Sequence, residues 1–363
     1  MSIIHDLLMR AIGAGASDVH IKINQPPYFR VNSKLVESGY DVISADDLTG
    51  IIKNIVPEFL QHRYEIEQEV DFSMNEENVG RFRVNVYTSQ RYPVIAMRHV
   101  KAAIPTFEEL RLPLQLKTLT QVQRGIILLV GVTGCGKSTT LAAIIGEINR
   151  TQQKRVITVE DPIEYQFYDD QSLITQREVG LDTHHFSSAL KHLLRQDPDV
   201  VLIGEMRDPE SIRTALLAAE TGHLVLSTLH ASTADSAIAR VLDVFPAEEQ
   251  SNIRMALASN IHAIICQRLI PDLRGLMTPA VEIMFNTSTV KKLIEKNNLE
   301  ILSAAIETGK DDGMQNFNQS IYQLIKQNLI SETEGMAAAT NPQALRMNLQ
   351  GIFLDEGRRI LSG

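Results

Sequence analysis

An apolar run leads directly into a glycine-rich turn at Gly125-Ile126-Ile127-Leu128-Leu129-Val130-Gly131-Val132-Thr133-Gly134-Cys135-Gly136-Lys137-Ser138. The turn matches the pattern G-x-x-x-x-G-K-[ST], and residues with helical spacing follow it. Between a buried strand and a helix, such a loop offers backbone N–H groups and the positive helix N-terminus to an anion. The sequence therefore predicts a phosphate-binding loop within a domain of the α/β class.

The side chains of this loop have separate expected roles. Lys137 is long enough to reach the β and γ phosphates of a nucleotide, and the Ser138 hydroxyl is a candidate ligand for Mg²⁺. Cys135 fits because its side chain is small, although a helix N-terminus close by leaves a reactive thiol as the alternative. The residues expected to hold the nucleotide at this loop are Gly131, Thr133, Gly134, Cys135, Gly136, Lys137, Ser138 and Thr139.

The residues on either side of the loop indicate a parallel sheet covered by helices. Short apolar runs, which suit strands buried on both faces, occur at 126–130, 156–159, 200–203 and 224–226. Helical spacing occupies the intervals at 138–149, 186–195, 209–220 and 234–244. Beyond Pro246 we expect one long helix that reaches Leu269, then a turn at 272–275, and mostly helix from Thr287.

Two of the predicted strands end in carboxylates. Glu160 follows the second apolar run and Glu205 follows the third. Because open α/β sheets bind ligands at the carboxyl ends of their strands, Glu160 is a candidate for holding Mg²⁺ through water. Glu205 is the candidate general base that deprotonates an attacking water. The alternatives are a turn cap before the following proline for Glu160, and a salt bridge to Arg207 or Arg213 for Glu205.

His230 ends the fourth predicted strand and belongs to the same edge. A histidine there can hydrogen-bond the γ-phosphate and respond to its loss, and the alternative is an ordinary strand-end histidine. The sequence contains no paired-cysteine and no His-x₃₋₅-His spacing, so we expect no structural zinc module.

The first hundred residues have a different, mixed pattern. Polar and apolar residues alternate at 18–23 and again at 80–87, which predicts half-buried strands. Ser44 has the form of a helix N-cap before a helical pattern that runs to Pro57. Regular patterns lapse between 102 and 113, where one or two helical turns would fit. We therefore expect an N-terminal domain at 1–100, a linker at 101–113 and a second domain at 114–363.

Composition excludes several classes of protein. Of 363 residues 44% are hydrophobic and 22% charged, which is typical of folded globular chains. The net charge of −9, without any basic block, argues against a nucleic-acid partner and against a helicase. Two cysteines cannot build a disulfide framework, and no apolar run approaches about 18 residues. We expect a cytoplasmic protein.

Several motifs in order carry a family resemblance. The chain resembles the secretion ATPases, and within them the PilT- and PilU-like retraction ATPases of type IV pili. Beyond the phosphate-binding loop, the segments that carry the resemblance are Val159-Glu160-Asp161-Pro162-Ile163-Glu164, Ile174-Thr175-Gln176-Arg177-Glu178-Val179-Gly180, Gly204-Glu205-Met206-Arg207-Asp208 and Ser227-Thr228-Leu229-His230. The resemblance implies a PAS-like N-terminal domain joined to a RecA-like ATPase domain with a mostly helical C-terminal part.

The resemblance also implies cofactors, partners and site residues. ATP and Mg²⁺ are the expected cofactors. A homo-hexameric ring is expected to act on an inner-membrane pilus platform protein, with a second retraction ATPase as a further partner, at the inner membrane. Glu160 and Glu164 match the family's Asp box, Glu205 its Walker B motif and His230 its His box. Family rings bring arginines of the N-terminal domain towards nucleotide, and the matching strands carry Arg81, Arg83 and Arg98.

Some alternatives stay open on the sequence alone. The three arginines also fit an ordinary solvated strand face. The segment Thr289-Val290-Lys291-Lys292-Leu293-Ile294-Glu295-Lys296 departs in charge from the corresponding PilT segment. An autonomous retraction motor and a PilU-like accessory or regulatory subunit, in which nucleotide occupancy switches partner binding, are therefore both compatible with the motifs.

Overall fold

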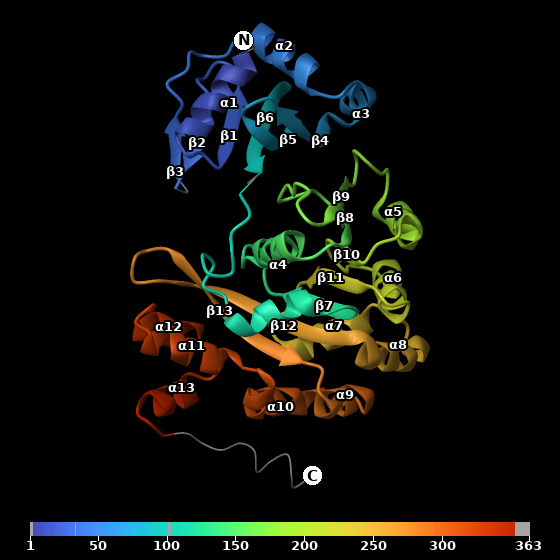
Figure 1. The fold of residues 1–363 in the computed structure, drawn as a ribbon. Coiled ribbons are helices and arrows are strands. Elements are labelled where there is room, and N and C mark those ends of the chain that lie inside the picture. The colour runs from blue at the N-terminus through green and yellow to red at the C-terminus, as the bar shows by residue number, and fades with distance from the viewer. Residues whose placement is uncertain (1–2, 33, 101–102, 353–363) are drawn as a thin grey trace. The chain divides into compact units, whose positions relative to one another are not determined.

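The computed structural model describes residues 3–32, 34–100 and 103–352, which divide into two compact units (Figure 1). The first unit holds the described residues of Met1–Ala103 and two later segments, Asp161–Gln166 and Glu178–His185. The second unit holds Ile104–Glu160, Phe167–Arg177 and the described residues from Phe186 onwards. Each unit combines helices with a sheet, which agrees with the expected α/β class.

The first unit contains an antiparallel sheet with the strand order β3-β2-β1-β6-β5-β4. Its strands are β1 (Asp18–Lys22), β2 (Tyr28–Val31), β3 (Lys34–Glu37), β4 (Glu69–Glu76), β5 (Gly80–Ser89) and β6 (Tyr92–Val100). Its helices are α1 (Ile3–Gly13), α2 (Ala45–Ile55) and α3 (Glu58–Glu67). The predicted alternation is confirmed, because Val19 and Ile21 on β1 and Phe82, Val84 and Val86 on β5 are all buried in one core. The strand period of two thus turns one face of the sheet towards apolar helix residues.

The cap predicted for α2 is present. The Ser44 Oγ accepts a hydrogen bond from the Asp47 backbone N–H at 3.1 Å, which satisfies a donor that the helix start leaves unpaired. The helix ends at Ile55, two residues before Pro57, because proline disfavours helical backbone in the residue before it.

The sheet of the second unit has the order β13-β12-β7-β11-β10-β8-β9. Its strands are β7 (Gly125–Val130), β8 (Arg155–Glu160), β9 (Leu173–Glu178), β10 (Val200–Ile203), β11 (Leu224–Leu229), β12 (Ile261–Pro271) and β13 (Met277–Phe285). The neighbours β12, β7, β11, β10 and β8 pair in parallel, whereas β13 is antiparallel to β12. The carboxyl ends of the parallel strands therefore meet at one edge.

Helices cover this sheet (Figure 1). The α-helices are α4 (Lys137–Thr151), α5 (Phe186–Leu193), α6 (Pro209–Glu220), α7 (Ala234–Asp243), α8 (Ala247–Asn260), α9 (Ser288–Glu295), α10 (Leu302–Thr308), α11 (Phe317–Lys326), α12 (Glu332–Ala338) and α13 (Pro342–Leu349). Short 3₁₀ helices are η1 (Leu114–Gln121), η2 (Leu194–Gln196), η3 (Leu299–Ile301) and η4 (Lys310–Asp312). The predicted helices between the strands and the helical C-terminal part are thus confirmed for the described residues, and α11 and α12 lie against β13 and β12.

The long helix predicted beyond Pro246 is wrong in its second half. Helix α8 ends at Asn260, and β12 begins at the next residue. Residues 263–267 are buried in succession, and a continuous apolar run of this kind fits a buried helix segment and a buried strand equally well by periodicity. These residues form a strand because they pair with β7 on one side and with β13 on the other. The turn predicted at 272–275 is confirmed by the Gly275 N–H, which donates to the Asp272 carbonyl at 3.0 Å.

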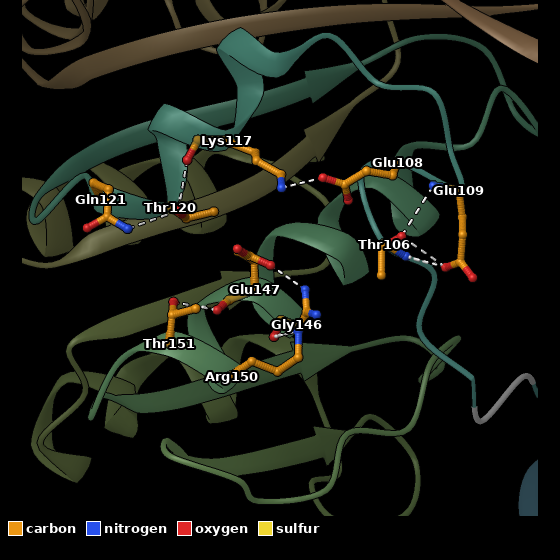
Figure 2. Close-up of polar contacts among 10 residues, drawn as sticks. All are labelled: Thr106, Glu108, Glu109, Lys117, Thr120, Gln121, Gly146, Glu147, Arg150 and Thr151. Carbon is orange, nitrogen blue, oxygen red and sulfur yellow. Dashed lines mark hydrogen bonds and ion pairs between the residues drawn. The ribbon is translucent and has the colours of Figure 1, made fainter.

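The segment before η1 forms a short hydrogen-bonded turn. The Leu110 N–H donates to the Thr106 carbonyl at 3.1 Å. The Glu109 carboxylate accepts from the Thr106 N–H at 2.7 Å, and Glu108 contacts Lys117 of η1 (Figure 2). Positions 101 and 102 of the predicted linker lie outside the described residues. Within the described ranges, no helix combines the length and apolar character that a membrane crossing requires.

Candidate active site

The glycine-rich loop connects the end of β7 to the start of α4 and packs tightly on its own side chains. A Cβ added at Gly131 would lie 2.4 Å from the Cys135 Sγ, and one at Gly136 would lie 2.7 Å from the Gln267 Nε2. Gly136 also has a φ of +91°, in the region that L side chains rarely adopt. Both positions therefore require glycine, and the loop curls closely enough to present its backbone to a ligand.

Lys137 lies across the mouth of the loop. Its Nζ donates to the carbonyl oxygens of Gly131 at 2.7 Å and Val132 at 3.1 Å, and the residue is only 8% exposed. Ser138 and Thr139, in the first turn of α4, are half-buried, whereas Thr133 and Gly134 are exposed at the loop tip. The arrangement places an ammonium group, hydroxyls and a helix N-terminus on one concave turn.

Cys135 is a packing residue in this geometry. Its side chain is 3% exposed and fills the space beside Gly131. Burial is the main cause that raises the pKa of the Cys135 thiol, although the Lys137 charge opposes it. A buried thiol with a raised pKa contradicts the alternative of a reactive thiolate.

Glu160 ends β8 and is held by neighbouring side chains. Its Oε1 accepts hydrogen bonds from the Thr158 Oγ1 at 2.7 Å and the Gln176 Nε2 at 3.2 Å, and the residue is 9% exposed. These two donors hold the Glu160 carboxylate at the end of β8. Glu164 is exposed and belongs to a segment of the first unit.

Glu205 and His230 come together from adjacent strands. Glu205 follows β10 and His230 follows β11, and the Glu205 Oε1 lies 3.5 Å from the His230 Nε2. The other oxygen of Glu205 accepts from the Arg207 Nε at 2.7 Å, so the predicted alternative pairing also exists. Arg207 is 64% exposed, and an exposed pair of this kind is strongly screened by water. Arg213 instead pairs with Glu249.

Two hydroxyl groups on β11 donate hydrogen bonds to backbone carbonyls at the end of β10, next to Glu205 and His230. The Ser227 Oγ donates to the Ile203 carbonyl at 2.6 Å, and the Thr228 Oγ1 donates to the Gly204 carbonyl at 2.8 Å. Burial lowers the pKa of His230, as does the Lys137 charge, while Glu205 acts in the opposite sense. The Gly131 N–H donates to the Leu229 carbonyl at 3.3 Å, so the start of the loop lies beside the end of β11.

The arginines expected to approach nucleotide are paired within the first unit. The Arg81 Nη2 donates to the Glu178 Oε2 at 2.6 Å, and the Arg98 Nε donates to the Asp18 Oδ1 at 2.8 Å. Arg83 lies 3.9 Å from Asp71, measured from Nε to Oδ1. Their approach to the nucleotide of a neighbouring subunit stays a prediction.

The sequence patterns did not predict two features of this site, the role of Gln267 and a cavity beside it. Gln267, on β12, binds the loop through its side-chain amide and is 4% exposed. Beside it lies a cavity of about 320 Å³, to which Thr139, Arg111 and Arg274 contribute. The segment of Gln267 was predicted as helix, so no signal connected it with the loop.

The model of the family described as "Type II/IV secretion system protein" matches residues 1–283. The chain belongs to this family. It is 38% identical to the type IV pilus retraction ATPase PilT of Pseudomonas aeruginosa, covering 94% of this chain and 99% of PilT. It is 37% identical to the type IV pilus ATPase PilU of the same organism, covering 95% and 90%.

A crystal structure of the pilus retraction motor PilT with bound ADP superposes with a TM-score of 0.87, at 38% identity, over 94% of this chain and 98% of that one. The predicted relationship to the PilT and PilU ATPases is therefore confirmed, and with it the fold class, an N-terminal domain joined to a RecA-like domain. The predicted enzyme class, an ATPase, is confirmed by the same relatives.

Proposed function

We propose that this chain hydrolyses ATP to power the retraction of a type IV pilus. The observation that carries the proposal is the approach of Glu205 to His230 beside a phosphate-binding loop, in a chain that matches a retraction motor with bound ADP over nearly its full length. The loop binds the phosphates through its N–H groups and Lys137. Glu205 is proposed to accept the proton of the attacking water, and His230, 3.5 Å from it, to sense the γ-phosphate.

Mg²⁺ suits the oxygen donors of this edge. Ser138 offers a hydroxyl, and Glu160 offers a carboxylate that Thr158 and Gln176 hold in place. Hydroxyl, carboxylate and water oxygens are the ligands that Mg²⁺ prefers. We propose that these two residues hold the ion, Glu160 through water. When bound, the ion would neutralise charge on the β and γ phosphates.

The cavity beside the loop suits the rest of the nucleotide. It adjoins Thr139 and Thr140 at the start of α4, and its volume of about 320 Å³ lies at the lower end of the range of ligand pockets, about 300–1,000 Å³. The leucines 110, 112, 269 and 276 give it apolar walls. We propose that the base and ribose enter here while the phosphates occupy the loop.

As a motor, the chain is proposed to act as a homo-hexamer at the inner membrane, on a pilus platform protein and alongside a second retraction ATPase. Glu164, Arg81, Arg83 and Arg98 are proposed to approach nucleotide within that ring. Support comes from the PilT and PilU relatives, whose identities of 38% and 37% are nearly equal. The PilU-like accessory role is therefore the second candidate.

Deletion of the gene, followed by assays of twitching and surface piliation, tests the proposal. Surplus, immobile pili are the expected result, and restoration should require an intact Lys137. Missing pili would contradict retraction and indicate assembly instead. If the Glu205→Gln variant fully restores retraction in the deletion strain, hydrolysis by this chain is dispensable and the accessory role replaces the motor.

A further inference from the structure

Gln267 joins the phosphate-binding loop to the neighbouring strand. Strand β12 pairs in parallel with β7, with Cys266 opposite Val130, so Gln267 lies beside the start of the loop. Its Nε2 donates to the Cys135 carbonyl at 2.7 Å, and its Oε1 accepts from the Thr140 Oγ1 at 2.8 Å. A single buried amide thus holds both the end of the loop and the first turn of α4.

The bond to Cys135 sets the direction of one peptide unit. In a trans peptide the C=O and the following N–H point in opposite directions. Because the Cys135 carbonyl points at Gln267, the N–H of Gly136 points away from it. A Cβ on Gly136 would lie 2.7 Å from the Gln267 Nε2, so the peptide packs directly on the amide. Without this donor, the carbonyl is free to rotate towards the anion site, where its partial negative charge repels phosphate.

We propose that Gln267 is a positioning residue for nucleotide binding, which holds the Cys135–Gly136 peptide with its N–H towards the phosphates. The inference rests on the proposed function and adds a residue to it. Gln267 borders the cavity proposed for base and ribose, but the hydrogen bonds of its amide go to the loop and to α4, through the Cys135 carbonyl and the Thr140 hydroxyl. An amide supplies a donor and an acceptor together, whereas a glutamate carboxylate only accepts and a methionine of similar length has no N–H or O–H donor.

The first test compares two isosteric variants. Gln267→Met removes both hydrogen bonds, and the matched control Gln315→Met removes an amide that donates to the Val281 carbonyl at 3.0 Å elsewhere in the second unit. Titration calorimetry with ADP and Mg²⁺ should give a dissociation constant at least about tenfold higher for Gln267→Met, since an orphaned buried carbonyl is costly. The control should bind as the wild type does. ADP affinity at the wild-type level in Gln267→Met overturns the proposal.

The second test uses pH and decides the matter even if Gln267→Met does not fold. In Gln267→Glu the ionised carboxylate accepts from Thr140 but cannot donate to the Cys135 carbonyl. Position 267 is only 4% exposed, so burial should raise the pKa of the introduced carboxyl above the usual value of about 4.3. As the pH falls from about 8 to about 5.5, protonation should therefore restore an O–H donor. The ratio of variant to wild-type dissociation constants should therefore shrink. A ratio that stays constant over this interval excludes a hydrogen-bond role.

Lys137→Ala, measured in parallel, separates this inference from the proposed function. If the wild type binds no ADP, the proposed function itself fails. If the wild type binds ADP, Lys137→Ala does not, and Gln267→Met binds as the wild type does, only the role of Gln267 fails.

Discussion

The Glu205 carboxylate lies 3.5 Å from the His230 imidazole, at the ends of two adjacent parallel strands. Neighbouring strands β10 and β11 hold this spacing through their register, in which Ile203 is opposite Ser227. The proposed base and the proposed phosphate sensor are therefore one coupled pair, and a change at either residue should alter the other.

Replacing Glu205 by glutamine should separate binding from hydrolysis. The amide keeps the size of the side chain but cannot accept the proton of water, so kcat should fall by about 10²–10⁴-fold. Nucleotide affinity, measured by calorimetry, should stay within about twofold because Lys137 and the loop remain. Glu210→Gln, which alters only an exposed carboxylate 3.7 Å from Lys191, is the control. Wild-type turnover in Glu205→Gln would remove Glu205 from the role of base.

The pH dependence of kcat/KM should report His230. Burial and the Lys137 charge lower its pKa below the usual 6.5, so the neutral imidazole predominates above that value. Protonated His230 should form an ion pair with Glu205, whose Oε1 lies 3.5 Å from its Nε2, and so withdraw the proposed base from water. The decline of kcat/KM that this causes should lie below pH 6.5. His230→Gln should lower the plateau and remove this contribution to the decline. An acid limb that is identical in the variant would assign the titration to another group.

Arg81 should matter for stability more than its neighbour Arg83 on the same strand. Glu178 is buried and accepts from Arg81, from the Ser73 Oγ at 2.6 Å and from the Ile163 N–H at 3.1 Å. Arg81→Met leaves this charge without its cation and should cost about 3 kcal/mol, visible as faster hydrogen exchange at 178–185. Arg83→Met breaks a long, exposed pair and should stay within about 0.5 kcal/mol.

An equal loss of stability in Arg81→Met and Arg83→Met would contradict this prediction. If both arginine variants destabilise the first unit equally, the buried Glu178 contact is not what sets the stability of this segment. The double variant Arg81→Met with Glu178→Gln should recover part of the loss, because no uncompensated charge remains buried.

Glu282 should make the protein less stable as the pH rises. Burial raises the pKa of this carboxyl above the usual 4.5, although the Ala234 N–H, which donates to it at 3.0 Å, acts in the opposite sense. The folded state therefore holds a proton that the unfolded chain has released, and stability falls as the pH rises from 4.5 through the raised pKa. Glu282→Gln does not titrate, so its free energy of unfolding should decline less over this interval. Urea denaturation at a series of pH values measures the difference.

Local sequence patterns predicted many helices and strands of the second unit, because helix caps and tight turns depend on residues close together in the chain. The α6 bounds, Pro209–Glu220, agree with the sequence prediction, since Asp208 supplies a cap and Pro209 suits the first helical position. The loop at 131–136 was predicted equally well from the sequence. Its glycines stand where a Cβ would clash with Cys135 of the loop itself or with the adjacent Gln267. By contrast, β12 was predicted as helix as far as Leu269, because its continuously buried stretch at 263–267 fits a buried helix and a buried strand equally well by periodicity.

Sequence alone was sufficient to predict the phosphate-binding loop, the parallel strands β7, β8, β10 and β11 and the acidic or histidine side chains that follow three of them, because each depends on residues only a few positions apart. Tertiary structure decided which side chains meet. Thr140 reaches Gln267, Ser73 reaches Glu178 and Glu205 reaches His230 only after the strands have taken their order and register. Contacts between residues so distant in sequence depend on packing of the whole unit, and no local pattern encodes them.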